Sequence, residues 1–138
     1  MAATRSKAAI AAAGAERFRT LIEIMQALRG PGGCPWDRKQ TLQSLRPFVL
    51  EETYEVLDAI DRGDVDALCA ELGDFLFEAV FLAQIAADRG RFTIADAIDA
   101  INAKLVRRHP HVFGEAAAAG AMRGGTRRRA ADRRAPKA

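Results

Sequence analysis

Residues 48–78 read FVLEETYEVLDAIDRGDVDALCAELGDFLFE, and this stretch decides the fold and the chemistry that we predict. It holds two helical patterns separated by a short break. Each pattern carries two acids three residues apart, Glu52 with Glu55 and Glu71 with Asp74. On an α-helix this spacing places both carboxylates on one face, a turn apart. Each pair is therefore able to hold one cation.

The second helical pattern is the more informative, because its acids have apolar surroundings. Residues 72–87 are apolar on nearly every face, and Asp74 and Glu78 are the charged side chains among them. This is typical of a helix that is buried all round. At 100° per residue, Glu71, Asp74 and Glu78 share one arc of about 60°. Unpaired carboxylates there would be costly or would take up a proton, so the arc predicts a bound partner.

The first helical pattern supplies carboxylates that can face this arc. Glu51, Glu52, Glu55 and Asp58 lie opposite an apolar stripe, with Glu52 closest to the apolar edge. For this helix alone, a solvated face is the alternative interpretation. If the two arcs meet, their negative charges require a cation. Oxygen ligands without sulfur or imidazole favour Mg²⁺, with Mn²⁺ as a substitute.

The charge distribution argues against nucleic acid as the main partner. The 138 residues carry a net charge of +3 and are 49% hydrophobic, which suffices for one domain with a core. Residues 123–138 contribute +6, whereas residues 16–122 carry −5. The folded part is therefore acidic. Nucleic-acid binding through the Arg-rich tail is retained as an alternative that a salt-dependent binding assay would test.

The two cysteines predict a reducing, cytoplasmic location. Cys34 and Cys69 form no CxxC motif, so the thiols are expected to stay reduced. No apolar run reaches the length of a membrane span, so no membrane partner is expected. The Ala-rich segment in residues 1–15 is too weakly hydrophobic to favour a secretion signal.

The pattern along the chain predicts an all-α fold, a four-helix bundle-like module that forms a dimer. We expect a flexible arm over residues 1–15, a helical module over residues 16–114 and a disordered basic tail over residues 115–138, whose Ala, Gly and Arg cannot build a core. The first helix is expected at about 16–29. The helix that carries Glu71 is apolar around more of its circumference than three neighbours would cover, which indicates a dimer.

The loop between the first helix and the acidic helices has two interpretations. It reads GPGGCPWDRKQ, with the single tryptophan, Trp36, next to Arg38 and Lys39. Trp36 could fill the end of the core. Alternatively, Trp36 helps to form the mouth of a nucleotide pocket, with Arg38 or Lys39 near phosphate. The last helix of the module is expected to begin after a Thr93 cap, with Asp96 completing a capping box.

Two basic side chains are expected near the core-facing side of that last helix. Ile94, Ile98, Ile101 and Leu105 form its predicted buried stripe, and helical geometry places Lys104 and Arg108 at the edge of this stripe. They could serve as counterions for the carboxylates. The preferred interpretation is that they hold the phosphates of a substrate.

With these residues in view, the sequence resembles the MazG family of nucleoside triphosphate pyrophosphohydrolases. The family hallmark, EExxE followed by ExxD, is present as Glu51, Glu52, Glu55, Glu71 and Asp74. Four segments occur in the family's order: GCPWD at 33–37, LEETYEVLDAI at 50–60, ELGDFLFE at 71–78 and KLVRRHPHVF at 104–113. The resemblance covers about residues 18–114.

The resemblance implies an α-helical module, commonly dimeric, that uses Mg²⁺ to hydrolyse nucleoside triphosphates to the monophosphate and pyrophosphate. It also implies a role in removing aberrant nucleotides. The metal ligands that it implies are Glu52, Glu55, Glu71 and Asp74, with Glu51 behind them in the catalytic set. It implies further that Lys104 and Arg108 face the phosphates.

Two further alternatives remain at this point. The module could bind metal and nucleotide without catalysis and serve dimerisation or regulation. A di-iron carboxylate bundle would need Glu-x-x-His pairs, and here the pairs are Glu-x-x-Glu and Glu-x-x-Asp. Many family members carry two modules in tandem, whereas this sequence shows one, as a single-module protein or as a truncated or degenerate relative would.

Overall fold

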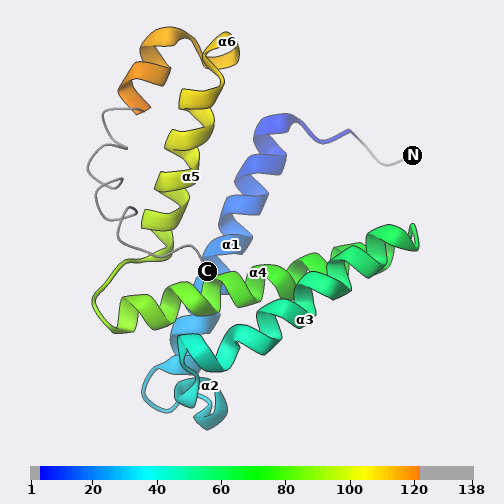
Figure 1. Cartoon of the computed structure of the whole chain (residues 1–138), viewed down its shortest axis with the longest axis vertical. Helices are drawn as coiled ribbons and strands as arrows, with labels where there is room; N and C mark the ends of the chain where they lie inside the picture. Colours follow the sequence, from blue (N-terminus) through cyan, green and yellow to red (C-terminus); the bar gives the residue numbers. More distant parts are fainter. Residues whose placement is uncertain (1–3, 122–138) are drawn as a thin grey trace. The chain divides into compact units, whose positions relative to one another are not determined.

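A computed structural model describes residues 4–121, and within them the protein is helical without a strand (Figure 1). The predicted all-α class is confirmed. The helices are α1 (Lys7–Arg29), α2 (Pro35–Lys39), α3 (Leu42–Asp61), α4 (Val65–Asp88), α5 (Ile94–Arg108) and α6 (Pro110–Phe113). The chain divides into two compact units, Met1–Arg91 with α1–α4 and Phe92–Ala138 with α5 and α6. Among the described helices, none has the length and hydrophobicity that crossing a membrane requires.

Helix α1 begins earlier than the sequence suggested. Its N-cap is Ser6, whose hydroxyl oxygen accepts a hydrogen bond from the Ala9 amide at 3.1 Å. The predicted start near residue 16 is therefore wrong, and residues 7–15 are helical rather than part of an arm. Their alanines have the highest helix propensity of any residue. At the other end, a Cβ on Gly33 would lie 2.2 Å from the Leu28 carbonyl oxygen, so the turn requires glycine.

Helix α3 begins several residues before Pro47. The Thr41 hydroxyl accepts from the Ser44 amide at 3.1 Å, and the Ser44 hydroxyl accepts from the Thr41 amide at 2.8 Å. These reciprocal bonds form a capping box, which starts the helix at Leu42. Pro47 consequently lies inside the helix. It is close enough to the start that the missing amide affects the first turns only.

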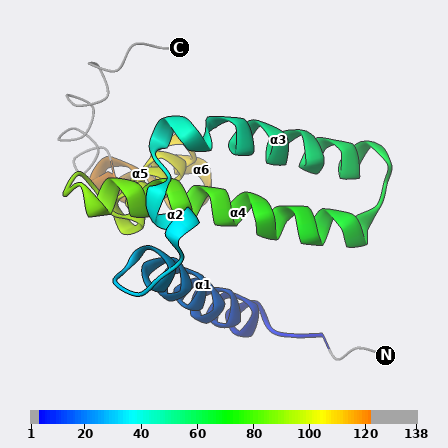
Figure 2. The same ribbon diagram turned by 90° about the horizontal axis from the view of Figure 1, so that it is seen from below.

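Helices α3 and α4 form an antiparallel hairpin and lie side by side (Figures 1 and 2). Gly63, with φ of 66°, ends α3, and the Asp64 carboxylate caps α4 by accepting from the Ala67 amide at 3.0 Å. Gly90 has φ of 67° just after α4. Two glycines with positive φ and an aspartate cap thus define the ends of the hairpin helices.

The core of the first unit lies far from the Gly63 turn and joins three helices. Its buried residues come from α1 (Met25), α3 (Leu45) and α4 (Val80, Phe81 and Ile85). Each is at most 2% exposed. Because Leu45 near the start of α3 packs with residues near the end of α4, this core sets the register of the antiparallel pair.

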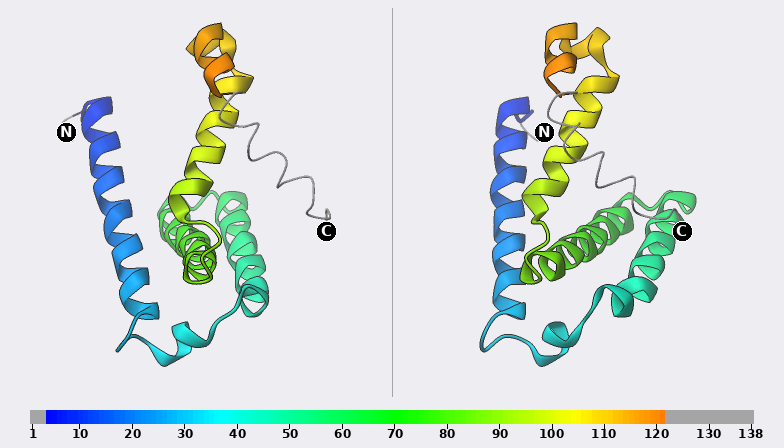
Figure 3. Two further views of the ribbon diagram at one scale, coloured as in Figure 1. Left: turned by 90° about the vertical axis from the view of Figure 1, so that its left-hand side faces the viewer. Right: turned by 60° about the vertical axis from the view of Figure 1, so that its left-hand side comes forward.

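Arg29, at the end of α1, contacts both the end of α4 and the α2 segment. Its guanidinium pairs with Asp88 of α4 at 2.9 Å, and its Nη1 donates to the backbone carbonyls of Asp37 at 2.6 Å and Gln40 at 3.3 Å. It also lies over the Phe81 ring, 5.7 Å from the centroid. Helix α2 sits in the connection between α1 and α3 (Figure 3). Arg29 therefore holds this connection against the core.

In the second unit, the predicted cap of α5 is present, but the predicted buried stripe is partly exposed. The Thr93 amide donates to the Asp96 carboxylate at 2.9 Å, as the capping box predicts. Ile101 and Leu105 are 44% and 46% exposed, so the predicted buried stripe is wrong for these two positions. Residues 115–121 are helical rather than disordered, in keeping with their alanines. The rest of the predicted tail, from residue 122, lies outside the described residues.

Replacing Arg29 by methionine should lower the free energy of unfolding by about 2 kcal/mol. The variant keeps most of the side-chain volume but removes charge-assisted hydrogen bonds from a side chain that is 10% exposed. Urea unfolding followed by circular dichroism measures the loss. Arg19→Met, at an exposed position of α1, is the matched control. Equal midpoints for the two variants would contradict the role given to Arg29.

Candidate metal centre

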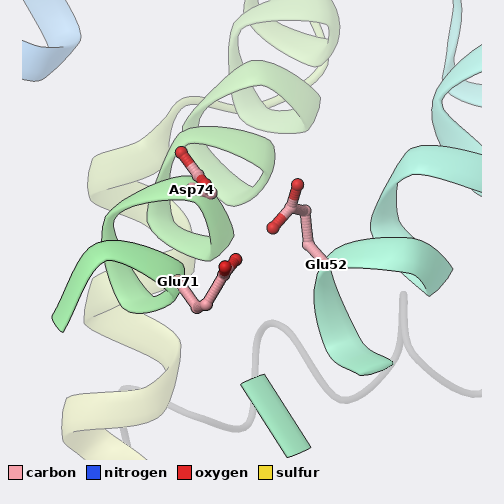
Figure 4. Close-up of side chains that lie close together, drawn as sticks. All are labelled: Glu52, Glu71 and Asp74. Atoms are coloured by element: carbon pink, nitrogen blue, oxygen red, sulfur yellow. The ribbon is translucent and has the colours of Figure 1, made fainter. Parts of the chain in front are cut away.

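Three of the predicted ligands meet between α3 and α4. One carboxylate oxygen each from Glu52, Glu71 and Asp74 lies within 4.8 Å of the other two. Figure 4 shows Glu52 on α3 facing Glu71 and Asp74 on α4. We call these three residues the carboxylate cluster.

The backbone explains why these side chains converge. Glu71 and Asp74 are three residues apart on α4 and therefore share one face. The buried core fixes the register of α3 against α4, and this register places Glu52 opposite the pair. Glu52 also lies nearest the apolar edge of its helix, as predicted, since its Oε2 atom is buried. Helical spacing thus aligns two ligands, and tertiary packing supplies the third.

The surroundings of the carboxylate cluster disfavour the ionised form of its carboxyl groups. The buried Oε2 of Glu52 has no hydrogen-bond partner. Burial raises the pKa of the Glu52 carboxyl above its ordinary value, and neighbouring negative charges raise it further. These charges belong, in decreasing order of effect, to Asp74, Glu71, Glu51 and Glu78.

Glu78 adds a fourth acid close to the cluster. It is 9% exposed, and its Oε2 is also buried without a hydrogen-bond partner. Burial raises the pKa of the Glu78 carboxyl, and the charge of Asp74 raises it further. The shared arc of Glu71, Asp74 and Glu78 was visible in the sequence, although the site prediction did not include Glu78.

The geometry of the cluster fits a metal ion. Within residues 4–121, the ion pairs join Arg29 to Asp88 and Arg62 to Asp58 and Asp64, so none neutralises the cluster. Oxygen ligands of Mg²⁺ lie at about 2.1 Å, which separates opposite ligands by about 4.2 Å. Three oxygens that share one Mg²⁺ ion are at most about 3.6 Å apart from one another, so the three carboxylates would move closer together when an ion binds. A buried, unpartnered carboxylate oxygen is also the atom that a cation would satisfy.

The other predicted acids lie outside the cluster. Glu55, predicted as the fourth ligand, is exposed, and so is Glu51. Glu55 follows Glu52 by one helical turn and carries a flexible side chain. Its assignment as a ligand stays a prediction.

The predicted substrate-binding residues are all exposed. Trp36 is 51% exposed and packs edge to face on Phe48, with ring centroids 5.6 Å apart. With this exposure it does not fill the end of the core, and it is not among the residues packed in the core cluster. Arg38 and Lys39 follow it on the surface of α2, and Lys104 and Arg108 lie on the surface of α5 in the second unit.

Sequence reasoning missed the framework that holds Trp36. Asp37 is 8% exposed, and its carbonyl accepts the 2.6 Å hydrogen bond from Arg29. Gln40 donates to the Trp36 carbonyl at 2.9 Å. No spacing rule connects Arg29 with Asp37, because the contact depends on the path of the intervening turn.

An all-α hairpin with a carboxylate cluster of this kind defines a class of helical metal-binding module, and comparison with known proteins names the family. Residues 40–113 match the family described as MazG nucleotide pyrophosphohydrolase domain. The chain belongs to the MazG family.

Several relatives show the same similarity. The chain is 56% identical over 98 residues to the Thermotoga maritima nucleoside triphosphate pyrophosphohydrolase/pyrophosphatase MazG, covering 71% of this chain and 38% of that protein. It is 58% identical over 99 residues to the Escherichia coli K12 nucleoside triphosphate pyrophosphohydrolase, with the same coverages. It is 55% identical over 96 residues to YabN of Bacillus subtilis, covering 70% of this chain and 20% of YabN. The chain thus spans well under half the length of these relatives.

Glu52→Gln should change how stability depends on pH in metal-free protein. Because the folded-state pKa of Glu52 is raised, its contribution to stability is present below the ordinary value of 4.5 and is lost as the pH rises through the folded value. Wild type should therefore lose stability relative to the variant as the pH rises above the ordinary value of 4.5. Urea unfolding in EDTA at several pH values measures this difference. A difference that stays constant across the range would contradict the raised pKa.

Proposed function

We propose that this protein hydrolyses nucleoside triphosphates to the nucleoside monophosphate and pyrophosphate, with Mg²⁺ as the metal and Mn²⁺ as a substitute. The observation that carries the proposal is the carboxylate cluster, in which Glu52, Glu71 and Asp74 converge with a buried oxygen that lacks a partner. Family membership and the names of the relatives support the reaction type.

In this mechanism the chain's own acids hold and orient the metal. Glu52, Glu71 and Asp74 would supply one carboxylate each, and Glu55 would be the fourth ligand. Glu51 would support these ligands without binding the ion. Mg²⁺ in this position would neutralise the triphosphate and lower the pKa of a bound water. The acids fix the place at which that charge is stabilised.

Basic side chains are the proposed phosphate-binding groups. Lys104 and Arg108 are exposed and one helical turn apart, so a single polyphosphate could contact both. Arg38 and Lys39 provide further cations near Trp36. In this proposal these cations bind the phosphates and stabilise the leaving pyrophosphate.

The aromatic pair on α2 and α3 suits the nucleoside part of the substrate. Phe48 precedes Glu52 by four residues, so its ring lies on the same face of α3, about 6 Å along the helix axis. Trp36 stands edge to face against Phe48 and leaves half of its surface exposed. A base that stacks on an exposed aromatic face gains about 1–3 kcal/mol.

Purified protein incubated with nucleoside triphosphates should release monophosphate and pyrophosphate in Mg²⁺ and nothing in EDTA. Glu71→Gln removes one ligand charge and should lower kcat/KM by at least about 100-fold. Glu23→Gln makes the same change at an exposed position of α1 and should retain activity. Chromatographic separation of the products over a panel of ribo- and deoxyribonucleotides measures both reaction and preference.

Two results of that assay would redirect the proposal. Diphosphate plus phosphate would exclude attack at the α-phosphorus. Nucleotide and metal binding without turnover would favour the alternative of a non-catalytic dimerisation or regulatory module.

We also propose that the protein is a homodimer. Large apolar side chains remain exposed on the α3–α4 hairpin, among them Leu50 (57%), Tyr54 (63%), Leu57 (48%), Leu72 (45%) and Leu76 (46%). Leu50, Tyr54 and Leu57 follow one another at spacings of four and three, which places them along one face of α3. An exposed stripe of this kind is characteristic of a surface that another chain covers.

Leu57→Lys should shift this dimer toward monomer. Burying a lysine amine in an apolar interface is costly, so the dissociation constant should rise by at least about 10-fold. Ile10→Lys, at a 56% exposed position of α1, is the control. Sedimentation equilibrium measures the masses, starting from a chain mass of 14.9 kDa. A wild-type protein that sediments as a monomer at high concentration would refute the dimer.

For the biological role we propose removal of aberrant nucleoside triphosphates in the cytoplasm. The family resemblance supports the role. The two free thiols, Cys34 and Cys69, support a reducing compartment.

A further inference from the structure

Glu78 is a buried acid that the proposed mechanism does not use. Its side chain is 9% exposed and its Oε2 has no hydrogen-bond partner, whereas the other buried residues of α4 are apolar. It makes no ion pair within residues 4–121. An unsatisfied buried polar atom costs about 1–3 kcal/mol, and more when it is charged. Packing alone would favour an uncharged side chain here.

The position of Glu78 relates it to the carboxylate cluster. It follows Asp74 by four residues on α4, so both lie on one face, a turn apart. Glu78 is nevertheless not among the three acids whose oxygens lie within 4.8 Å of one another. Glu78 is therefore close to the carboxylate cluster but is not one of its three members.

We propose that Glu78 is a positioning residue of the metal centre, and that its carboxylate accepts a hydrogen bond from a water molecule bound to the ion. This inference rests on the proposed metal site. Mg²⁺ dehydrates reluctantly and usually keeps several waters, so an acid one layer outside the direct ligands has a donor to meet. Such outer partners commonly contribute 10- to 100-fold in metal affinity.

A role for Glu78 in metal binding and a role in stabilising the fold predict different changes in metal affinity and in the stability of the metal-free protein. If Glu78 serves the ion, then removing its charge relieves repulsion in the metal-free protein and weakens metal binding. If Glu78 serves the fold, then removing its charge lowers stability and leaves metal affinity unchanged. The two effects have opposite signs and are measured separately.

The test uses the full chain without nucleotide, so that turnover plays no part. Mn²⁺ binding is measured by isothermal titration calorimetry and by the loss of the free-ion electron paramagnetic resonance signal. Thermal unfolding in EDTA gives the stability of the metal-free state. The variants are Glu78→Gln, which removes the charge, and Glu78→Asp, which keeps it on a shorter side chain. Glu23→Gln, exposed on α1, is the matched control.

We expect Glu78→Gln to bind Mn²⁺ about 10- to 100-fold more weakly than wild type and to unfold at a higher temperature in EDTA. Glu78→Asp should recover part of the affinity, and Glu23→Gln should match wild type. Unchanged Mn²⁺ affinity in Glu78→Gln overturns the role of Glu78 while leaving the metal site intact. A wild-type protein that binds no Mn²⁺ overturns the metal site, and the role of Glu78 with it.

Discussion

The register between α3 and α4 is the constraint on which the rest of the first unit depends. Leu45, Val80 and Phe81 are fully buried together, and each buried side chain of this size contributes about 1.5–3 kcal/mol. This apolar contact forces Glu52 against Glu71 and Asp74, whose charges repel. The core therefore supplies the free energy that holds an unfavourable cluster of charge in place, and a cation would relieve the strain.

Arg29 plays the complementary part at the other end of the hairpin. There a single guanidinium satisfies Asp88 and two backbone carbonyls of the α2 segment. Charge is thus compensated within the chain near the core and left uncompensated at the cluster. This contrast separates a structural ion pair from a candidate metal site.

Helical periodicity was sufficient to predict the all-α class and the shared arc of Glu71, Asp74 and Glu78. It could not place helix starts where local chemistry competes. The alanines of residues 7–15 extend α1, and the capping box of Thr41 and Ser44 starts α3 before Pro47. Contacts made through turns, such as Arg29 with Asp37, leave no pattern in the sequence. Burial of single side chains also depends on neighbours that spacing does not reveal, as Trp36 shows.

The carboxylate cluster is confined to residues 52–74, within one hairpin whose connection includes Gly63. Closing so short a loop costs little chain entropy, and contacts that are local in sequence form quickly. Helices α1 to α4 leave the ribosome before α5, because synthesis starts at the N-terminus. N-terminal parts of a chain generally fold first. The three acids can therefore be assembled while the rest of the chain is still being translated, and a cation could bind this nascent hairpin before synthesis ends.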